Sequence, residues 1–409
     1  MKTVHVYFCG WGERWLLGTL AHSGRAILFE YSAESLKRKL ELSPFNLPLQ
    51  AAAYGDFPAY QHQLPGLIAD ALPDGWGMLL MDRLFKANNR PLSTVSPLDR
   101  LAFIHDRAMG ALAFEPADPL GEDAADIDLI ELAKSAQLVL ADKDTAALKQ
   151  LALLGGSPHG ARPKVLVQFD PKARTISTLP AADGEAWLVK FHAMNEHKEV
   201  CALENLYARI ARECGLDMPA TEYFDLAPNL SAFGIERFDR DGGLRIPTLT
   251  LAGLTDDNFR IPAQDYRTLL RATRALTHDE REVQKAFARC VFNVAMNNRD
   301  DHTKNFSFAM NERFEWKLAP CYDLTFNYGP SGWHQMTIMG EGVAPTRKHL
   351  LDLAKDSGLK PGFASEVIAR VAEAASGFPL LAKDYPIRRA TVKDIAGHVL
   401  KNLAAFKAY

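Results

Sequence analysis

One change in the pattern of apolar and polar residues along the chain constrains its fold more than any other sequence feature. From Gly155 onward, three short β-rich runs separated by turns (KVLVQFD, TISTLP and AWLVKFH) precede one amphipathic helical segment, residues 199–219. Two further strand-like runs, TEYFDLA and SAFGIERFDR, follow this segment, and after about residue 262 the pattern is mainly helical. This order predicts a strand-rich lobe with one helix, followed by a helical lobe.

The first 115 or so residues have a different pattern, which mixes strand-like and helical runs. Short strand-like runs (TVHVYFCG, RAILFEY and GALAFEP) surround one helical run, which we expect over residues 66–89. The acidic segment 116–129, which contains Pro and Gly, is the best linker candidate. We therefore predict an α+β protein divided into a mixed α/β N-terminal domain (1–120), a linker and helix (121–154), a strand-rich lobe (155–240) and a helical lobe (241–409).

Composition excludes few classes of function. The 409 residues include 47 basic and 50 acidic side chains, so the net charge of -3 gives no global signal for nucleic acid or membrane binding. No apolar run approaches the roughly 18 residues of a membrane helix, and the N-terminus does not resemble a signal peptide. Five scattered cysteines without a CxxC motif favour buried thiols in a reducing cytoplasm over disulfides or a zinc site. We expect a cytoplasmic protein with no membrane partner.

A polar loop, NNRDDHTKNFSF (297–308), holds the strongest chemical signal. It follows the longest predicted helix of the last lobe, for which Thr277 and Glu280 form an expected capping box. Asp300 and Asn305 lie five residues apart, and Asp323 comes 18 residues later. Phosphoryl transfer needs a carboxylate near the attacking hydroxyl and oxygen ligands for Mg²⁺. The Asp-x-x-x-x-Asn spacing followed by a later Asp has that layout.

Two other interpretations of this loop stay open at this point. Asn and Asp are also common turn formers after a helix, so the loop alone is a moderate signal. A metallohydrolase site would use His302 with Asp300 or Asp301 as ligands, and His334 is the candidate for the second histidine that such sites usually need. This metal-site hypothesis is the weaker one.

The strand-rich lobe contains further residues that a phosphotransferase needs. Lys190 ends the apolar run AWLVKFH and requires a partner if buried, and Glu204 on the following helix is a candidate for that partner. The Gly-rich loop GGSPHGARPK (155–164) has glycines that let backbone N–H groups approach an anion, with Arg162 and Lys164 adding charge. Its Ser157 is either structural or a candidate for phosphorylation. The segment 235–240 (IERFDR) can offer backbone groups to an adenine edge.

Together these segments resemble the HipA family of serine/threonine kinases, the toxins of type II toxin–antitoxin pairs. In the N-terminal part, LPDGWGMLLMDRLF and DRLAFIHDRAMGALAFEP resemble segments of that family. GGSPHGARPK is similar to its Gly-rich loop, WLVK to its ATP-lysine strand and IERFDR to its interlobe hinge. NRDDHTKNFSF and LAPCYDL resemble its catalytic and metal-binding loops, and this pair is the most specific.

The resemblance implies a protein-kinase-like fold with two lobes after the N-terminal domain, and a role for individual residues. Asp300 would be the catalytic residue, Asn305 and Asp323 would hold Mg²⁺, and His302 and Lys304 would support the catalytic loop. The residues implied in ATP binding are Lys190, its partner Glu204, the hinge residues Glu236 and Phe238, and Gly160 and Lys164 of the Gly-rich loop. Ser157 matches an autophosphorylated serine of the family, although Pro158 and His159 depart from its usual Gly and Ser.

The implied function is an ATP- and Mg²⁺-dependent protein kinase that inhibits growth as a toxin. Its implied partners are a helix-turn-helix antitoxin resembling HipB, operator DNA bound mainly through that antitoxin, and a protein substrate of translation such as an aminoacyl-tRNA synthetase. Two alternatives remain: a kinase for a lipid or small molecule, because the Asp-x-His-x-x-Asn pattern also resembles phosphatidylinositol-kinase loops, and a kinase-shaped co-repressor with little turnover.

Overall fold

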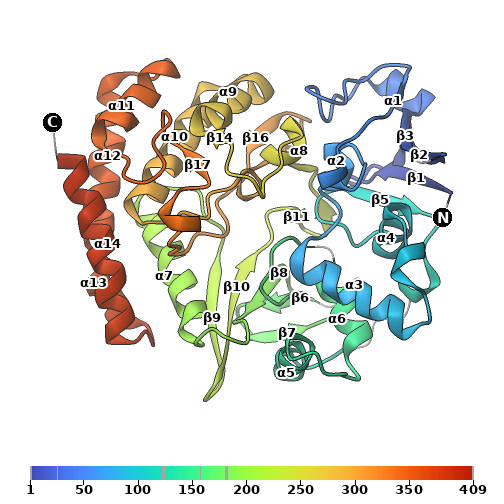
Figure 1. Cartoon of the computed structure of the whole chain (residues 1–409), viewed down its shortest axis with the longest axis horizontal. Coiled ribbons are helices and arrows are strands. Elements are labelled where there is room, and N and C mark those ends of the chain that lie inside the picture. The colour runs from blue at the N-terminus through green and yellow to red at the C-terminus, as the bar shows by residue number, and fades with distance from the viewer. Residues whose placement is uncertain (1, 25, 122–125, 157, 180–182, 408–409) are drawn as a thin grey trace.

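The structure is a computed structural model that describes residues 2–24, 26–121, 126–156, 158–179 and 183–407. Figure 1 shows an N-terminal sheet on one side of the molecule, a second sheet near the centre and a group of helices, α9 to α14, on the other side. The strand-rich and helical lobes follow each other in the predicted order. Among the described residues, none of the helices combines the length and apolar character needed to cross a membrane.

The N-terminal sheet is antiparallel throughout, in the order β4-β3-β2-β1-β5. Its side chains alternate as expected for a sheet with one buried face, and Val4, Val6 and Phe8 of β1 are fully buried. The sheet and its flanking helices are β1 (Thr3–Phe8), β2 (Trp15–Ser23), β3 (Ala26–Tyr31), α1 (Ala33–Arg38), β4 (Ala53–Tyr54), α4 (Pro97–Ile104) and β5 (Leu112–Glu115). Sequence analysis missed β2, the middle strand.

The single helix expected over residues 66–89 is wrong. The structure has two helices instead, α2 (Gly66–Ala69) and α3 (Gly75–Ala87), with an irregular turn between them. Pro73 has no N–H for a helical hydrogen bond, and Gly75 adopts a positive φ of 34°. The Pro-Asp-Gly sequence therefore ends one helix and starts another, and Asp74 is placed in a turn rather than on a helix face.

Two helices, α5 (Leu129–Leu140) and α6 (Leu148–Gly155), connect the N-terminal domain to the second sheet. That sheet is also antiparallel, in the order β7-β6-β8-β10-β9. Its strands and its single helix are β6 (Lys164–Asp170), β7 (Thr175–Ser177), β8 (Glu185–Phe191), α7 (Glu199–Glu213), β9 (Thr221–Ala227) and β10 (Leu230–Glu236). The register places Lys164 directly opposite Lys190. Both lysines therefore lie on adjacent strands at the same end of the sheet.

The helical lobe surrounds a small antiparallel sheet, β13-β15-β16. Its helices are α8 (Leu251–Thr255), α9 (Tyr266–Thr277), α10 (Glu280–Ala295), α11 (Arg347–Asp356), α12 (Pro361–Ser376), α13 (Phe378–Leu381) and α14 (Arg389–Lys407). Its strands are β11 (Arg240–Asp241), β12 (Leu244–Arg245), β13 (Thr248–Thr250), β14 (Gln264–Asp265), β15 (Ser307–Met310), β16 (Trp316–Leu318) and β17 (Met336–Thr337).

The predicted capping box at Thr277 and Glu280 is wrong. Thr277 is the last residue of α9, where its hydroxyl donates to the carbonyl of Thr273 (2.7 Å). Asp279 caps α10 instead, because its carboxylate accepts the backbone N–H of Arg281 (3.0 Å). The error arose because two helices meet within two residues.

Residues at and just before the start of helix α14 form hydrogen bonds with α7, the single helix of the strand-rich lobe. Glu199, at the start of α7, is 3% exposed and accepts hydrogen bonds from Arg388 N (2.7 Å), Arg388 Nη2 (2.6 Å) and Thr391 Oγ1 (2.8 Å). Near the middle of the helix, the Tyr207 hydroxyl donates to the carbonyl of Met296 (2.8 Å). Helix α7 is thereby tied to the helical lobe at two points.

Asp239 joins the N-terminal domain to the segment between the lobes. This carboxylate is 1% exposed and accepts the backbone N–H of Gly110 (2.7 Å), while Arg237 and Arg240 each donate to it at 2.8 Å. Burial alone would raise the pKa of Asp239, but the two guanidinium groups outweigh it and hold the pKa far below its usual range.

We predict that Asp239→Asn lowers the free energy of unfolding by about 3–5 kcal/mol, since it leaves two arginines without a compensating buried charge. Urea unfolding at neutral pH measures the change. Because the folded pKa is depressed, the stabilisation by Asp239 is present above about pH 4 and is lost as the pH falls further. Asp241→Asn, two residues away and exposed, is the control and should change stability little. Equal stability of both variants would contradict the prediction.

Candidate functional site

A cleft of about 660 Å³ lies where the two lobes and the N-terminal domain meet. Its size is typical of sites for small molecules and cofactors. With one exception, Glu204, every described residue that was predicted for the site lines this cleft: Gly160, Lys164, Lys190, Glu236, Phe238, Asp300, His302, Lys304, Asn305 and Asp323. Ser157 lies outside the described residues.

Lys190 occupies the inner end of the cleft. It is 8% exposed, and its Nζ lies 2.5 Å from Glu204 Oε1 and 2.6 Å from Asp323 Oδ1. Burial opposes a charged ammonium, but the two carboxylates outweigh this effect and raise the pKa of Lys190 above its usual value. Strand β8, helix α7 and the loop after β16 thus meet at one cation. The structure brings together the predicted pair of Lys190 and Glu204, with Glu204 behind the lysine.

Asp323 has an uncommon backbone conformation and a side chain whose negatively charged form is strongly favoured. Its φ of 56° lies in the left-handed region, which residues other than Gly and Asn seldom adopt. Burial would raise the pKa of Asp323, but Lys190 and Lys164 lower it well below the usual range. The side chain is therefore a carboxylate at neutral pH, and it can act as a hard oxygen ligand.

The catalytic-loop candidates Asp300 and Asn305 are held against each other. The Asn305 amide Nδ2 donates to the carbonyl of Asp300 (2.7 Å), and the short helical turn Thr303–Asn305 closes the loop. The Asp300 side chain is 47% exposed and points to the cleft. Partial burial, together with the nearby charge of Asp323, raises the pKa of Asp300 although His302 lowers it. A carboxylate in this position is accessible to a proton from a bound hydroxyl.

Asp301 and His334 have structural positions. Asp301 is 1% exposed and accepts hydrogen bonds from the Tyr266 hydroxyl (2.7 Å), His334 Nδ1 (2.8 Å) and the backbone N–H of Gln335 (2.9 Å). These bonds hold the base of the loop against α9. The metallohydrolase hypothesis used His302 with Asp300 or Asp301, and His334 as a second histidine. No group of three or more His, Cys, Asp or Glu that could hold a metal ion occurs among the described residues.

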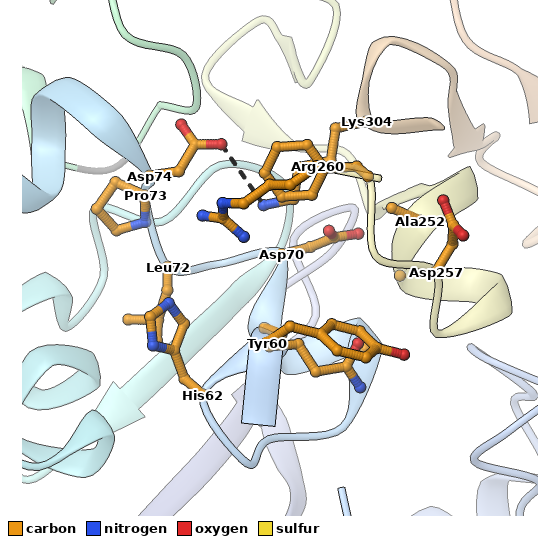
Figure 2. Close-up of a pocket in the computed structure, with 15 residues that line it drawn as sticks. Tyr60, His62, Asp70, Leu72, Pro73, Asp74, Ala252, Asp257, Arg260 and Lys304 are labelled. Atoms are coloured by element: carbon orange, nitrogen blue, oxygen red, sulfur yellow. Dashed lines mark ion pairs between the residues drawn. The ribbon is translucent and has the colours of Figure 1, made fainter. Parts of the chain in front are cut away.

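His302 and Lys304 support the loop from its other side. His302 Nε2 lies 4.0 Å from Asp300 Oδ1, and its ring packs on Phe259 at 5.3 Å between centroids. The Lys304 ammonium lies 4.7 Å from the Phe259 ring centroid and 3.9 Å from Asp74 Oδ2 (Figure 2). Burial lowers the pKa of Lys304, although Asp70 and Asp74 partly compensate.

The predicted hinge lines one part of the cleft with apolar side chains. The Phe238 ring stacks on Tyr322, with 5.6 Å between centroids and 27° between planes, and Leu188 and Ile235 line the same end of the cleft. The backbone N–H of Glu236 donates to the carbonyl of Ala220 (2.9 Å). That amide is therefore already paired within the lobe, and a ligand at this end meets mainly ring faces and aliphatic side chains.

The Gly-rich loop lies over the cleft in a conformation that requires glycine. Gly160 has a φ of 102°, and a Cβ there would lie 2.3 Å from Lys164 Nζ. Lys164 is 2% exposed and donates to the carbonyl of His159. Burial, followed by the charge of Lys190 opposite, lowers the pKa of Lys164 to about 8. The ammonium of Lys164, which we predicted to add positive charge to the Gly-rich loop, lies beneath that loop.

Sequence analysis missed Asp74, which lies in the N-terminal domain and lines the same cleft. Its carboxylate accepts the backbone N–H of Gly160 in the Gly-rich loop. The signal was the Pro-Asp-Gly triplet at 73–75, a strong turn former that was taken as part of a helix. Recognising the turn would have removed Asp74 from a helix face, although nothing local identifies a partner 86 residues away.

Comparisons with known proteins find similarity in both the N-terminal and the C-terminal part of the chain. Two family models match: the HipA N-terminal domain over residues 11–115 and the HipA-like C-terminal domain over residues 156–377. A curated protein of Haemophilus influenzae named "Putative kinase" is 29% identical over 150 residues, which make up 32% of this chain and 40% of that protein. The chain thus matches less than half the length of that relative.

One solved structure shows the same fold over nearly the whole chain. The HipA chain of a toxin–antitoxin complex of Shewanella oneidensis MR-1, which contains HipA, HipB and operator DNA, superimposes with a TM-score of 0.69 at 17% identity, covering 98% of this chain and 96% of that chain. The kinase CtkA of Helicobacter pylori superimposes with a TM-score of 0.41 at 14% identity, covering 59% of this chain and 93% of that chain.

The predicted fold class is confirmed: a strand-rich lobe and a helical lobe of protein-kinase-like type follow a mixed α/β domain. The C-terminal family model alone matches more than half of the residues. The chain belongs to the HipA family and contains both of that family's domains.

Proposed function

We propose that this protein is an ATP- and Mg²⁺-dependent protein serine/threonine kinase that inhibits growth as the toxin of a toxin–antitoxin pair. One observation carries the proposal. The buried ammonium of Lys190 lies between Glu204 and Asp323 at the inner end of a cleft, and the accessible carboxylate of Asp300 lies nearer its mouth. Phosphoryl transfer depends on this combination of an oriented cation, oxygen ligands and an acceptor-side carboxylate.

The residues present fit a nucleotide with its metal ion. Asp323 carries a stabilised negative charge, and the Asn305 amide is fixed by its bond to the Asp300 carbonyl, so both can offer oxygen to Mg²⁺. Two carboxyl or amide ligands suffice, because Mg²⁺ takes its remaining ligands from phosphates and water. When bound, the ion would offset negative charge on the transferred group. Phe238, Tyr322 and Leu188 line the cleft and offer the apolar surface and ring faces that suit a base.

The chain's own residues have distinct tasks in this proposal. Lys190 holds the phosphates, and Glu204 keeps its ammonium aimed into the cleft. Asp300 orients the acceptor hydroxyl and takes its proton as the oxygen attacks the terminal phosphorus of ATP. The bond between that phosphorus and the bridging oxygen breaks, and ADP leaves. Glu236 and Phe238 border the base, and Gly160 and Lys164 shape the loop over the phosphates.

The proposed partners follow from family membership and from the likeness to a HipA chain seen with HipB and operator DNA. We propose a helix-turn-helix antitoxin resembling HipB, with operator DNA bound mainly through it. The proposed substrate is a translation protein such as an aminoacyl-tRNA synthetase, in the cytoplasm. Transfer of labelled phosphate only to lipids or metabolites would instead favour a small-molecule kinase. Calorimetry showing no Mg·ATP binding would favour a co-repressor with little turnover.

Asp300→Asn should reduce phosphate transfer by about 10²–10⁴-fold, the usual contribution of a positioned general base. Because the side chain is half exposed, the melting temperature should stay close to that of the unsubstituted protein. Transfer from γ-labelled ATP to protein and thermal unfolding provide the two measurements. Asp301→Asn is the matched control: it should lower the melting temperature, since Asp301 is buried with three hydrogen-bonding partners. Full activity and full toxicity of Asp300→Asn would refute the proposed function.

Asp323→Asn should remove most of the Mg²⁺-dependent part of nucleotide affinity, by tenfold or more, since it replaces a carboxylate ligand by a neutral amide. Calorimetry with a non-hydrolysable ATP analogue, with and without Mg²⁺, separates this effect from a general loss of binding. Affinity in EDTA should change less. The same Mg²⁺ dependence in variant and unsubstituted protein would argue against Asp323 as a ligand.

Ser157→Ala should make the protein more toxic and keep it active longer, if phosphorylation of this serine shuts off nucleotide binding. Growth curves after induction measure toxicity, and mass spectrometry of the peptide around residue 157 detects the modification. The double variant with Asp300→Asn should not be toxic. Equal toxicity of Ser157→Ala and the unsubstituted protein would count against self-inhibition.

A further inference from the structure

A short segment of the N-terminal domain lies directly on the Gly-rich loop. We call residues 72–76, which lead from the turn after α2 into the first two residues of α3, the LPDGW segment. Four hydrogen bonds join it to the loop. His159 Nε2 donates to the Leu72 carbonyl (3.0 Å), and the Gly160 N–H donates to Asp74 Oδ1. The Trp76 N–H donates to the Gly160 carbonyl (3.2 Å), and Trp76 Nε1 donates to the Lys164 carbonyl (3.1 Å). The loop is thus bound by another domain at His159, Gly160 and Lys164.

The two segments also approach too closely for a side chain between them. A Cβ at Gly75 would lie 2.8 Å from the Cα of Ala161 and 3.0 Å from the Gly160 carbonyl oxygen, both backbone atoms. Gly75 also has a positive φ of 34°. The turn that interrupts the helical pattern of residues 66–89 therefore brings backbone against backbone, and the Gly-rich loop cannot shift toward the N-terminal domain.

Asp74 touches the catalytic loop as well. Its second oxygen, Oδ2, lies 3.9 Å from Lys304 Nζ, one residue before Asn305 (Figure 2). Burial would raise the pKa of Asp74, but His159 and Lys304 outweigh it and keep the pKa below the usual value, so the group is charged. One carboxylate from the N-terminal domain therefore contacts both loops that border the cleft.

We infer that the N-terminal domain helps to form the cleft, and that Asp74 is the positioning residue that holds the Gly-rich loop over it. Asp74 fixes Gly160 by a hydrogen bond to a charged acceptor, the stronger class of hydrogen bond, and aligns it with the catalytic loop through Lys304. The inference rests on the proposed function in one respect only, namely that the ligand beneath the loop is a nucleotide.

Two substitutions separate the contacts of Asp74. Asp74→Ala removes both, whereas Asp74→Asn keeps an oxygen that can accept the Gly160 N–H and loses the charge facing Lys304. We expect amide hydrogen exchange in residues 158–164 to become at least tenfold faster in Asp74→Ala, with a smaller increase in Asp74→Asn. The dissociation constant of a non-hydrolysable ATP analogue with Mg²⁺ should rise about tenfold in Asp74→Ala, equivalent to ~1.4 kcal/mol.

Asp82→Asn is the matched control. Asp82 is an acidic residue of the same domain, on α3, and pairs with Arg100 at 2.6 Å without contacting the Gly-rich loop. It should leave exchange in residues 158–164 and nucleotide affinity unchanged. Gly75→Ala tests the same contact by sterics without altering any charge, and should reproduce the faster exchange.

Exchange is measured without nucleotide, so it tests the positioning role whether or not the protein is a kinase. If the unsubstituted protein binds no nucleotide but Asp74→Ala still accelerates exchange, the proposed function fails and the positioning role stands. Unchanged exchange in a folded Asp74→Ala protein would overturn the inference. Tighter nucleotide binding by Asp74→Ala would also overturn it, because Asp74 would then compete with phosphate for the Gly160 N–H.

Discussion

The buried ammonium of Lys190 determines the arrangement of the whole cleft. A cation at 8% exposure is stable only with charged partners, and here they come from helix α7 and from the loop at Asp323. The strand-rich lobe supplies the lysine, its helix supplies Glu204 and the helical lobe supplies Asp323. The two lobes are thereby held in a relative position that leaves a cleft between them, with Asp300 nearer its mouth.

The N-terminal domain adds two more charged contacts of the same kind. Asp239 ties the segment between the lobes to Gly110, and Asp74 ties the Gly-rich loop to the LPDGW segment. In both cases a buried carboxylate accepts a backbone N–H of another domain and faces basic side chains. The N-terminal domain is therefore hydrogen-bonded to the hinge segment between the lobes and to the Gly-rich loop.

Local patterns predicted much of this arrangement. Strand β9 follows its sequence pattern over Thr221–Ala227, and Asp300 and Asn305, selected by their spacing, lie in one loop that lines the cleft. The errors occurred where one element meets another. The turn at Pro73 was hidden inside a helical pattern, and α9 and α10 meet within two residues. The contacts of Asp74 and the burial of Asp301 depend on residues far away in sequence, which no spacing rule contains.

The attachment of α14 to Glu199 has a consequence for control of the protein. In a two-lobed enzyme, moving the helix that carries the partner of the lysine would break the ion pair and switch the site off. Here the C-terminal helix grips the start of that helix through Arg388 and Thr391, and Tyr207 anchors it further along. Swinging α7 would require undocking the end of the chain. Residues at the start of the C-terminal helix therefore help to keep Glu204 of α7 beside Lys190.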